Sequence, residues 1–111
     1  MSNPFLAIII PAYNEEKRLP KTLDQVFSFL EAQPYLSEVI IIDNASDDQT
    51  FPIAQEFAEK HNGAQTQVRV MQEPIRGKGI AVRIGMLASR ADYRIMCDAD
   101  LSMPIDQVKR F

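Results

Sequence analysis

Two aspartates, Asp98 and Asp100, are separated by one residue directly after an apolar run. On an extended segment, side chains two residues apart point to the same side, so the two carboxylates would repel each other. A divalent cation removes this repulsion, and Mg²⁺ typically takes one or two carboxylates together with phosphate oxygens. An exposed acidic turn that caps a helix beginning at Pro104 explains the pair equally well. Glycoside hydrolysis fits less well, because its two carboxylates must flank a sugar.

A second candidate segment, RGKG, combines two cations with two glycines at residues 76–79. Glycines let the backbone approach a ligand closely, while Arg76, Lys78 and the N-terminus of a following helix would attract a diphosphate. A solvated basic turn is the alternative. The phosphate-loop pattern is absent. GxGxxG is absent too, because Val82 stands where its third glycine would be. The missing third glycine argues against a dinucleotide-dependent oxidoreductase.

Two further polar segments, at residues 11–15 and at Asp43, follow apolar runs. The Asp43 carboxylate could accept hydrogen bonds from a nucleobase N–H or a ribose hydroxyl, or it could simply cap a turn. Tyr13 and its polar neighbours could line a pocket for a base, or form ordinary polar surface. The candidate residues of the first segment are Pro11, Ala12, Tyr13, Asn14 and Glu15. A nucleotidyltransferase is disfavoured, because its glycine-rich loop would follow the first strand and PAYNEE contains no glycine.

Four apolar runs predict the strands that place these residues. They cover residues 5–10, ended by Pro11, then residues 39–42, a shorter run around Val68 and Val70, and residues 93–97. Continuous apolar runs rich in β-branched residues are typical of strands that are buried on both faces. Each of these strands is followed by one of the polar segments, so all four segments come at strand ends.

Helical periodicity fills the intervals between the predicted strands. One apolar stripe runs from Leu19 to Leu30, with Pro20 in the first turn. A second helix opens at Pro52 and ends at His61-Asn62-Gly63. In a third helix the stripe Ile80, Ile84, Leu87 and Ala91 is expected to face the core, and Pro104 is expected to start a fourth.

Alternation of strands and helices predicts an α/β fold, a Rossmann-like open parallel sheet with helices on both faces. Ligands of such sheets bind beyond the carboxyl ends of the strands, where loops and helix N-termini converge. The four polar segments should therefore share one edge of the sheet. We expect a single binding crevice there.

Composition narrows the classes of function. The chain has 111 residues, 46% of them hydrophobic and 24% charged, which is typical of one soluble globular domain. A formal net charge of -3 argues against a general nucleic-acid-binding face. Cys97 is the only cysteine, so we expect no internal disulfide and a reducing, cytoplasmic location. No run approaches the roughly 20 apolar residues that a membrane helix requires.

Taken together, the segments IIIPAYNEEKRL, EVIIIDNASDDQT, EPIRGKGIAVRIGML and YRIMCDADLSMP resemble successive landmarks of the inverting family 2 nucleotide-sugar glycosyltransferases. The likeness is greatest to the polyprenyl-phosphate branch, the dolichyl-phosphate mannose and glucose synthases. It extends over residues 5–104, and four segments in the same order are far more specific than any one of them. The fold that it implies is the nucleotide-binding half of the A-type glycosyltransferase fold.

The resemblance implies roles for the candidate residues. Residues 11–15 and Asp43 would hold the base and ribose, and Arg76, Gly77 and Lys78 would lie near the donor. The Asp98-Ala99-Asp100 motif would bind Mg²⁺ or Mn²⁺ on the diphosphate of a UDP- or GDP-sugar. The implied reaction is inverting transfer to an acceptor, for which a polyprenyl phosphate at the cytoplasmic face of a membrane is the candidate.

Two features depart from that pattern. Ser102 stands where some relatives carry a further polar metal ligand. Members of the family also continue well beyond this length, so we expect residues 1–111 to be the donor-binding portion of a truncated domain whose catalytic base lies elsewhere. A non-catalytic nucleotide-binding module, or a fragment without activity, is the alternative. Self-association through an uncovered apolar edge is a further expectation.

Overall fold

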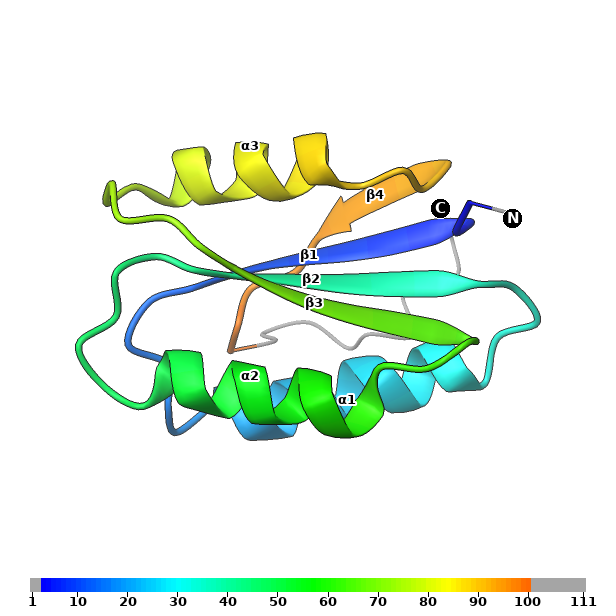
Figure 1. Ribbon diagram of the computed structural model, residues 1–111, viewed down its shortest axis with the longest axis horizontal. Helices are drawn as coiled ribbons and strands as arrows, with labels where there is room; N and C mark the ends of the chain where they lie inside the picture. Colours follow the sequence, from blue (N-terminus) through cyan, green and yellow to red (C-terminus); the bar gives the residue numbers. More distant parts are fainter. Residues whose placement is uncertain (1–2, 101–111) are drawn as a thin grey trace.

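A computed structural model describes residues 3–100, which form four parallel strands and three helices in strict alternation (Figure 1). The strands are β1 (Leu6–Ala12), β2 (Ser37–Asp43), β3 (Thr66–Gln72) and β4 (Tyr93–Met96). The helices are α1 (Leu19–Glu31), α2 (Thr50–His61) and α3 (Lys78–Ala88). The predicted α/β class is confirmed, whereas Ser102 and the helix expected at Pro104 lie outside the described residues. None of the described helices is long and apolar enough to cross a bilayer.

The helices cover both faces of the sheet, as predicted. Figure 1 shows α1 and α2 on one face and α3 on the other. The apolar stripe of α1 is buried as expected, with Leu19, Leu23, Val26 and Leu30 packed on the face of β1 that carries Ile8. Helix α2 begins at Thr50, two residues before the proline that was expected to open it. One side of the sheet is therefore packed by large side chains.

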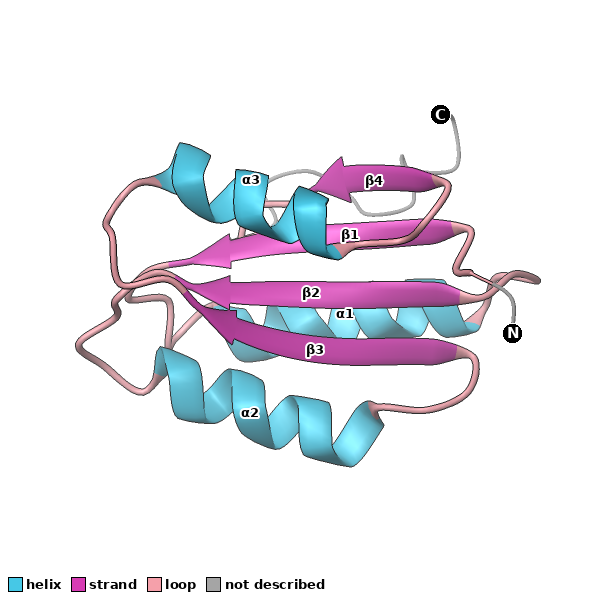
Figure 2. Ribbon diagram, turned by 45° about the horizontal axis from the view of Figure 1, so that its top comes forward, coloured by secondary structure: helices cyan, strands magenta, loops and turns pink. Residues whose placement is uncertain are grey.

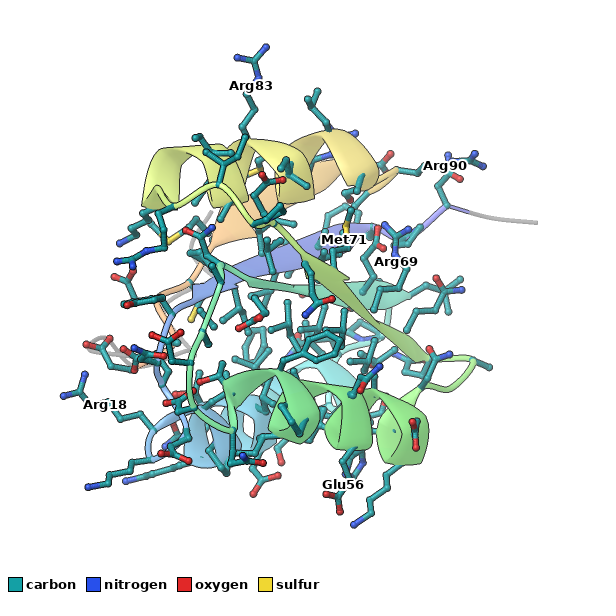
Figure 3. All side chains as sticks on the ribbon, turned by 60° about the vertical axis from the view of Figure 1, so that its left-hand side comes forward. Arg18, Glu56, Arg69, Met71, Arg83 and Arg90 are labelled. Carbon is teal, nitrogen blue, oxygen red and sulfur yellow. The ribbon has the colours of Figure 1, made fainter. Side chains whose placement is uncertain are left out.

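Helix α3 packs on the opposite face through small residues, and the stripe predicted for it is only partly correct: Ala91 is buried just beyond the helix, whereas Ile80 is exposed. Its fully buried positions are Ala81 and Gly85, whereas Leu87 is 74% exposed. A Cβ atom at Gly85 would lie 2.4 Å from Cγ2 of Ile9, so only glycine permits this close approach of helix and sheet. In Figure 3 Arg83 points away from the sheet on the outer side of α3.

The first strand is longer than predicted, because β1 continues through Pro11 to Ala12. The backbone N–H of Cys97 donates to the carbonyl of Ile9, so the N–H and C=O groups of the odd-numbered residues of β1 point towards β4. Pairing with β4 ends at Ile9, and Pro11 therefore sits where no ladder partner needs its missing N–H.

The strand order is β3-β2-β1-β4, and the chain reverses its direction of travel across the sheet between β3 and β4. Figure 2 shows all four strand arrows pointing towards the same end of the sheet, with the short β4 ending before the other three. The loop after β1 leads to α1 on one face of the sheet, whereas the loop after β3 leads to α3 on the other face, so the two loops diverge. This arrangement is a topological switch point, the place where open parallel sheets form a crevice.

Candidate functional site

A cavity of about 630 Å³ opens at this switch point, between the ends of β1 and β4 and the N-terminus of α3. We call it the switch-point pocket. Its walls contain nearly all of the predicted site residues, with Asn14 and Asp43 absent and Asn44 added. The lining residues are Pro11, Ala12, Tyr13, Glu15, Asn44, Arg76, Gly77, Lys78, Asp98, Ala99 and Asp100.

The segment that carries the two aspartates is anchored from below by α1. The Thr22 hydroxyl, buried in the core, donates to the carbonyl of Ala99, which is also buried. The carboxylates on either side are left at the pocket, with Asp98 half-buried and Asp100 exposed. One turn of backbone is thus fixed while its acidic side chains remain accessible.

Cys97 lies beside this segment, and its thiol is poorly suited to nucleophilic chemistry. Burial, with added repulsion from Asp98 and Asp100, raises the pKa of Cys97 to about 11. A thiol with that pKa carries almost no thiolate at neutral pH, so we assign Cys97 a packing role.

Two cations reach across the pocket from the start of α3, Arg76 in the preceding loop and Lys78 as the first residue of the helix. The Lys78 ammonium lies 2.5 Å from Oδ1 of Asp98. The guanidinium of Arg76 stacks on Tyr13, with Cζ 3.6 Å from the ring centroid, and Nη1 donates to the Tyr13 hydroxyl at 2.9 Å. The predicted basic segment therefore faces both the first loop and the aspartates.

Asn44 holds that basic loop in place, a role that sequence reasoning missed. Its Nδ2 donates to the carbonyls of Glu73 at 2.9 Å and Ile75 at 2.8 Å, and its Oδ1 accepts from the N–H of Gly77 at 2.9 Å. Gly77 has a φ of 150°, which side chains disfavour, so glycine is required at this turn. An amide directly after a buried strand was the available signal, because it can both donate and accept.

Two acidic residues close to the pocket keep unused acceptor atoms. Asp43 is 2% exposed and is not among the lining residues, and its Oδ1 has no hydrogen-bond partner among residues 3–100. Oε2 of Glu15, a lining residue, likewise accepts no hydrogen bond within the described chain, although Nη1 of Arg18 is 3.6 Å away. Buried acceptors without partners are rare, and those at pockets are candidates for ligand contacts.

Asn14 belongs to a different structure, which we call the loop junction, formed by residues 14–16 and 46–50. The Asn14 N–H donates to the Ser46 hydroxyl at 2.9 Å, and Oδ1 of Asn14 accepts from the N–H of Asp47 at 2.8 Å. The residue is in the left-handed region, with a φ of 51°, which asparagine tolerates well. Its observed contacts tie two loops together.

Asp48 completes the loop junction. Its Oδ1 accepts from the N–H of Thr50 at 2.9 Å and from the Thr50 hydroxyl, and its Oδ2 accepts from the N–H of Glu16 at 3.3 Å. Desolvation opposes ionisation, but these hydrogen bonds outweigh it and hold the pKa of Asp48 below its ordinary value. The Thr50 hydroxyl also accepts from the N–H of Glu15 at 2.8 Å.

The oxygen atoms at the pocket fit a divalent ion that is bound partly by protein carboxylates and partly by phosphate oxygens. Residues 3–100 contain no cluster of three or more His, Cys, Asp or Glu side chains that could enclose a metal. Asp98 and Asp100 supply two carboxylates, and Asp98 already contacts a cation, the Lys78 ammonium. Mg²⁺ and Mn²⁺ suit such oxygen-rich, partly open sites.

Residues 7–111 match the family described as Glycosyl transferase family 2. The chain belongs to this family. A dolichyl-phosphate beta-glucosyltransferase from Mus musculus is 36% identical over 110 residues, which are 95% of this chain and 34% of that protein. Its counterpart from Drosophila melanogaster is 41% identical over 100 residues, 86% of this chain and 30% of that protein. This family 2 chain thus spans about a third of these relatives' length.

A solved structure supports the same assignment. A mannosyltransferase from Pyrobaculum calidifontis, in complex with GDP-Man and Mn²⁺, superposes with a TM-score of 0.74 at 27% sequence identity. The superposition covers 90% of this family 2 chain and 28% of the mannosyltransferase. The family and the fold expected from the sequence are therefore both confirmed.

Proposed function

We propose that this chain forms the donor site of a metal-dependent glycosyltransferase that takes a sugar from a UDP- or GDP-sugar. The observation that carries the proposal is the switch-point pocket, in which two carboxylates and two cations face one another. Family membership supports it, as does the relative that was solved with GDP-Man and Mn²⁺.

The proposed roles follow from the position of each group. Arg76, Lys78 and the free N–H groups at the start of α3 would neutralise the diphosphate. Asp98 and Asp100 would hold Mg²⁺ or Mn²⁺, which when bound stabilises negative charge on the departing diphosphate. The nucleoside would lie towards β1 and β2, where Tyr13 offers an aromatic face and Glu15 and Asp43 have acceptor atoms to spare.

We further propose that the acceptor is a polyprenyl phosphate, reached at the cytoplasmic face of a membrane, and that transfer inverts the anomeric centre. The similarity to dolichyl-phosphate beta-glucosyltransferases supports this acceptor class. Cell fractionation tests the location, because we expect the protein that contains this chain in the membrane pellet, released by detergent.

Calorimetric titration of the chain with UDP-glucose and with GDP-mannose, each with and without Mn²⁺, tests the proposal. We expect one of the two donors to bind, and to bind more tightly when Mn²⁺ is present. A folded sample that binds neither donor under either condition would overturn the proposal.

Asp43→Ala tests the nucleoside end of the site separately. We expect it to weaken binding of the free nucleoside as well as the nucleotide sugar, because a hydrogen-bond acceptor is lost. Asp47→Ala is the matched control, since it removes the same charge from an exposed side chain in the next loop. Equal nucleoside affinities in wild type and Asp43→Ala would contradict the assigned role.

A further inference from the structure

The start of α3 carries an electrostatic conflict. Arg76 and Lys78 flank the N-terminus of this helix, and its first turn contains no acidic residue. A helix N-terminus bears partial positive charge, so cations placed there are repelled by it. Conflicts of this kind are typical of binding sites, where a ligand supplies the missing counter-charge.

Within residues 3–100 the conflict at Lys78 is relieved by Asp98, whose carboxylate contacts the ammonium across the pocket. That carboxylate is also half of the proposed metal site. Lys78 and a divalent ion would therefore compete for Asp98, while Asp98 and a diphosphate would compete for Lys78.

We propose that Lys78 is a placeholder cation, which neutralises Asp98 in the empty pocket and exchanges that partner for the diphosphate when donor and metal bind. The inference rests on the proposed function, because it takes Asp98 as a metal ligand and the diphosphate as the anion. It assigns Lys78 a role in coupling the two ligands, beyond adding positive charge.

The ion pair is suited to exchange because it is weak and flexible. The side chains of Lys78 and Asp98 are 59% and 43% exposed, and pairs this open to water add little stability. Lysine also carries its charge on a flexible four-carbon stem, whereas the planar guanidinium of Arg76 is stacked on Tyr13. The ammonium can therefore change partners by rotation of its side chain.

The backbone beneath Lys78 does not need to move during this exchange. Asn44 fixes the preceding loop through three hydrogen bonds, two donated by its Nδ2 and one that its Oδ1 accepts from the N–H of Gly77. The device is thus confined to one side chain on a fixed support.

Exchange of partners makes metal and nucleotide binding mutually dependent. Metal alone must displace Lys78 from Asp98, and diphosphate alone must displace Asp98 from Lys78. Bound metal frees Lys78 from Asp98, and bound diphosphate frees Asp98 from Lys78. Each ligand should therefore raise the affinity for the other ligand by the same factor. The bond between metal and diphosphate also couples the two ligands, so exchange at Lys78 should add to that coupling, whereas a purely structural ion pair would add nothing.

Lys78→Met tests the inference, because methionine keeps an apolar stem and loses the charge. Binding of Mn²⁺ alone is measured from the EPR signal of free Mn²⁺, and binding of UDP and GDP by calorimetry with and without Mn²⁺. We expect Lys78→Met to bind Mn²⁺ alone up to about fivefold more tightly, the scale of an exposed ion pair. It should bind diphosphate alone more weakly, and the coupling factor should fall below that of wild type, to the part that the metal–diphosphate bond supplies.

Lys60→Met is the matched control. Lys60 pairs with Glu56 on the surface of α2 at 2.7 Å, so the substitution removes the same charge from a similar pair outside the pocket. It should match wild type in every measurement, and Lys78→Arg should retain the coupling.

Mn²⁺ affinity that is unchanged or lower in Lys78→Met would overturn the inference, and so would an equal gain in Lys60→Met. If wild type binds the metal–nucleotide pair and Lys78→Met keeps its coupling, only the placeholder role fails. Failure of wild type to bind either nucleotide with Mn²⁺ would instead overturn the proposed function together with this inference.

Discussion

The loop junction and the switch-point pocket lie at the same edge of the sheet and are built from similar residues, yet their polar groups are satisfied differently. In the loop junction Asn14 and Asp48 bond to groups of the neighbouring loop. In the pocket, the side chains of Lys78 and Asp98 contact each other and remain partly exposed to solvent. Acceptor atoms of Asp43 and Glu15 accept no hydrogen bond from the described residues.

The difference separates support from binding. Polar groups that hydrogen-bond to one another need no ligand and hold a loop rigid. Charged groups that face a cavity can still form favourable interactions with a ligand. Residue type alone does not distinguish the two, because aspartate and asparagine occur in both. Substitutions in the loop junction should therefore lower stability, whereas substitutions in the pocket should lower ligand affinity.

Asp100→Ala should give the largest effect, and it should fall on affinity. Loss of a residue that only hydrogen-bonds to a metal ligand can weaken metal binding by roughly 100-fold. Loss of one of the two carboxylates themselves should weaken Mn²⁺-dependent nucleotide binding by at least as much. The midpoint of thermal unfolding should not fall, because the exposed side chain makes no core contact. Calorimetry and circular dichroism measure the two quantities.

Asp92→Ala is the matched control for this substitution, since Asp92 is an exposed aspartate at the opposite end of β4. It should bind metal and nucleotide like wild type. Unchanged Mn²⁺-dependent affinity in Asp100→Ala would mean that the pocket is not a metal site, and the comparison would lose one of its sides.

Asp48→Ala should produce the reverse pattern, a loss of stability. Three hydrogen bonds to the carboxylate disappear, and we expect the free energy of unfolding to fall by about 2 kcal/mol. The affinity of the remaining folded protein for Mn²⁺ should change little. Urea titration gives the stability, and Asp47→Ala, an exposed neighbour, serves as the control.

A drop in Mn²⁺ affinity as large as that of Asp100→Ala would show that the loop junction and the pocket are one unit. The distinction drawn between them would then be wrong.

Sequence patterns were sufficient to place the polar segments at one edge, because continuous apolar strands followed by polar residues have one interpretation in a parallel sheet. They could not separate Asn14 from Tyr13, since adjacent residues of a loop point in different directions. Nor could they reveal Asn44, whose partners at residues 73, 75 and 77 are distant in sequence.

The inward face of α3 was mispredicted for another physical reason. Hydrophobic periodicity selects large apolar residues, so it chose Ile80 and Leu87, which are exposed. Close packing of a helix on a sheet instead requires small residues, and Ala81 and Gly85 occupy that face. A pattern weighted by side-chain size would have found it.

Thr22→Val should have a smaller effect that falls on both sides of the comparison. Valine keeps the shape but leaves the buried Ala99 carbonyl without its donor, which should cost about 1 kcal/mol of stability. The Asp98–Asp100 segment should also be held less firmly, and Mn²⁺ affinity should fall several-fold. A stability loss with wild-type Mn²⁺ affinity would show that this anchor does not position the carboxylates.

Acid should produce the smallest effect, and it should act on the loop junction. The pKa of Asp48 is lowered in the folded state, so its ionised form favours folding above the pKa of the unfolded chain. That contribution is lost as pH falls through the lowered folded value. Asp48→Asn removes the charge, so its stability deficit should be present at about pH 6 and shrink towards about pH 3. Urea titration at both pH values measures the deficit, and one that stays constant would mean that hydrogen-bond geometry, rather than charge, makes Asp48 important.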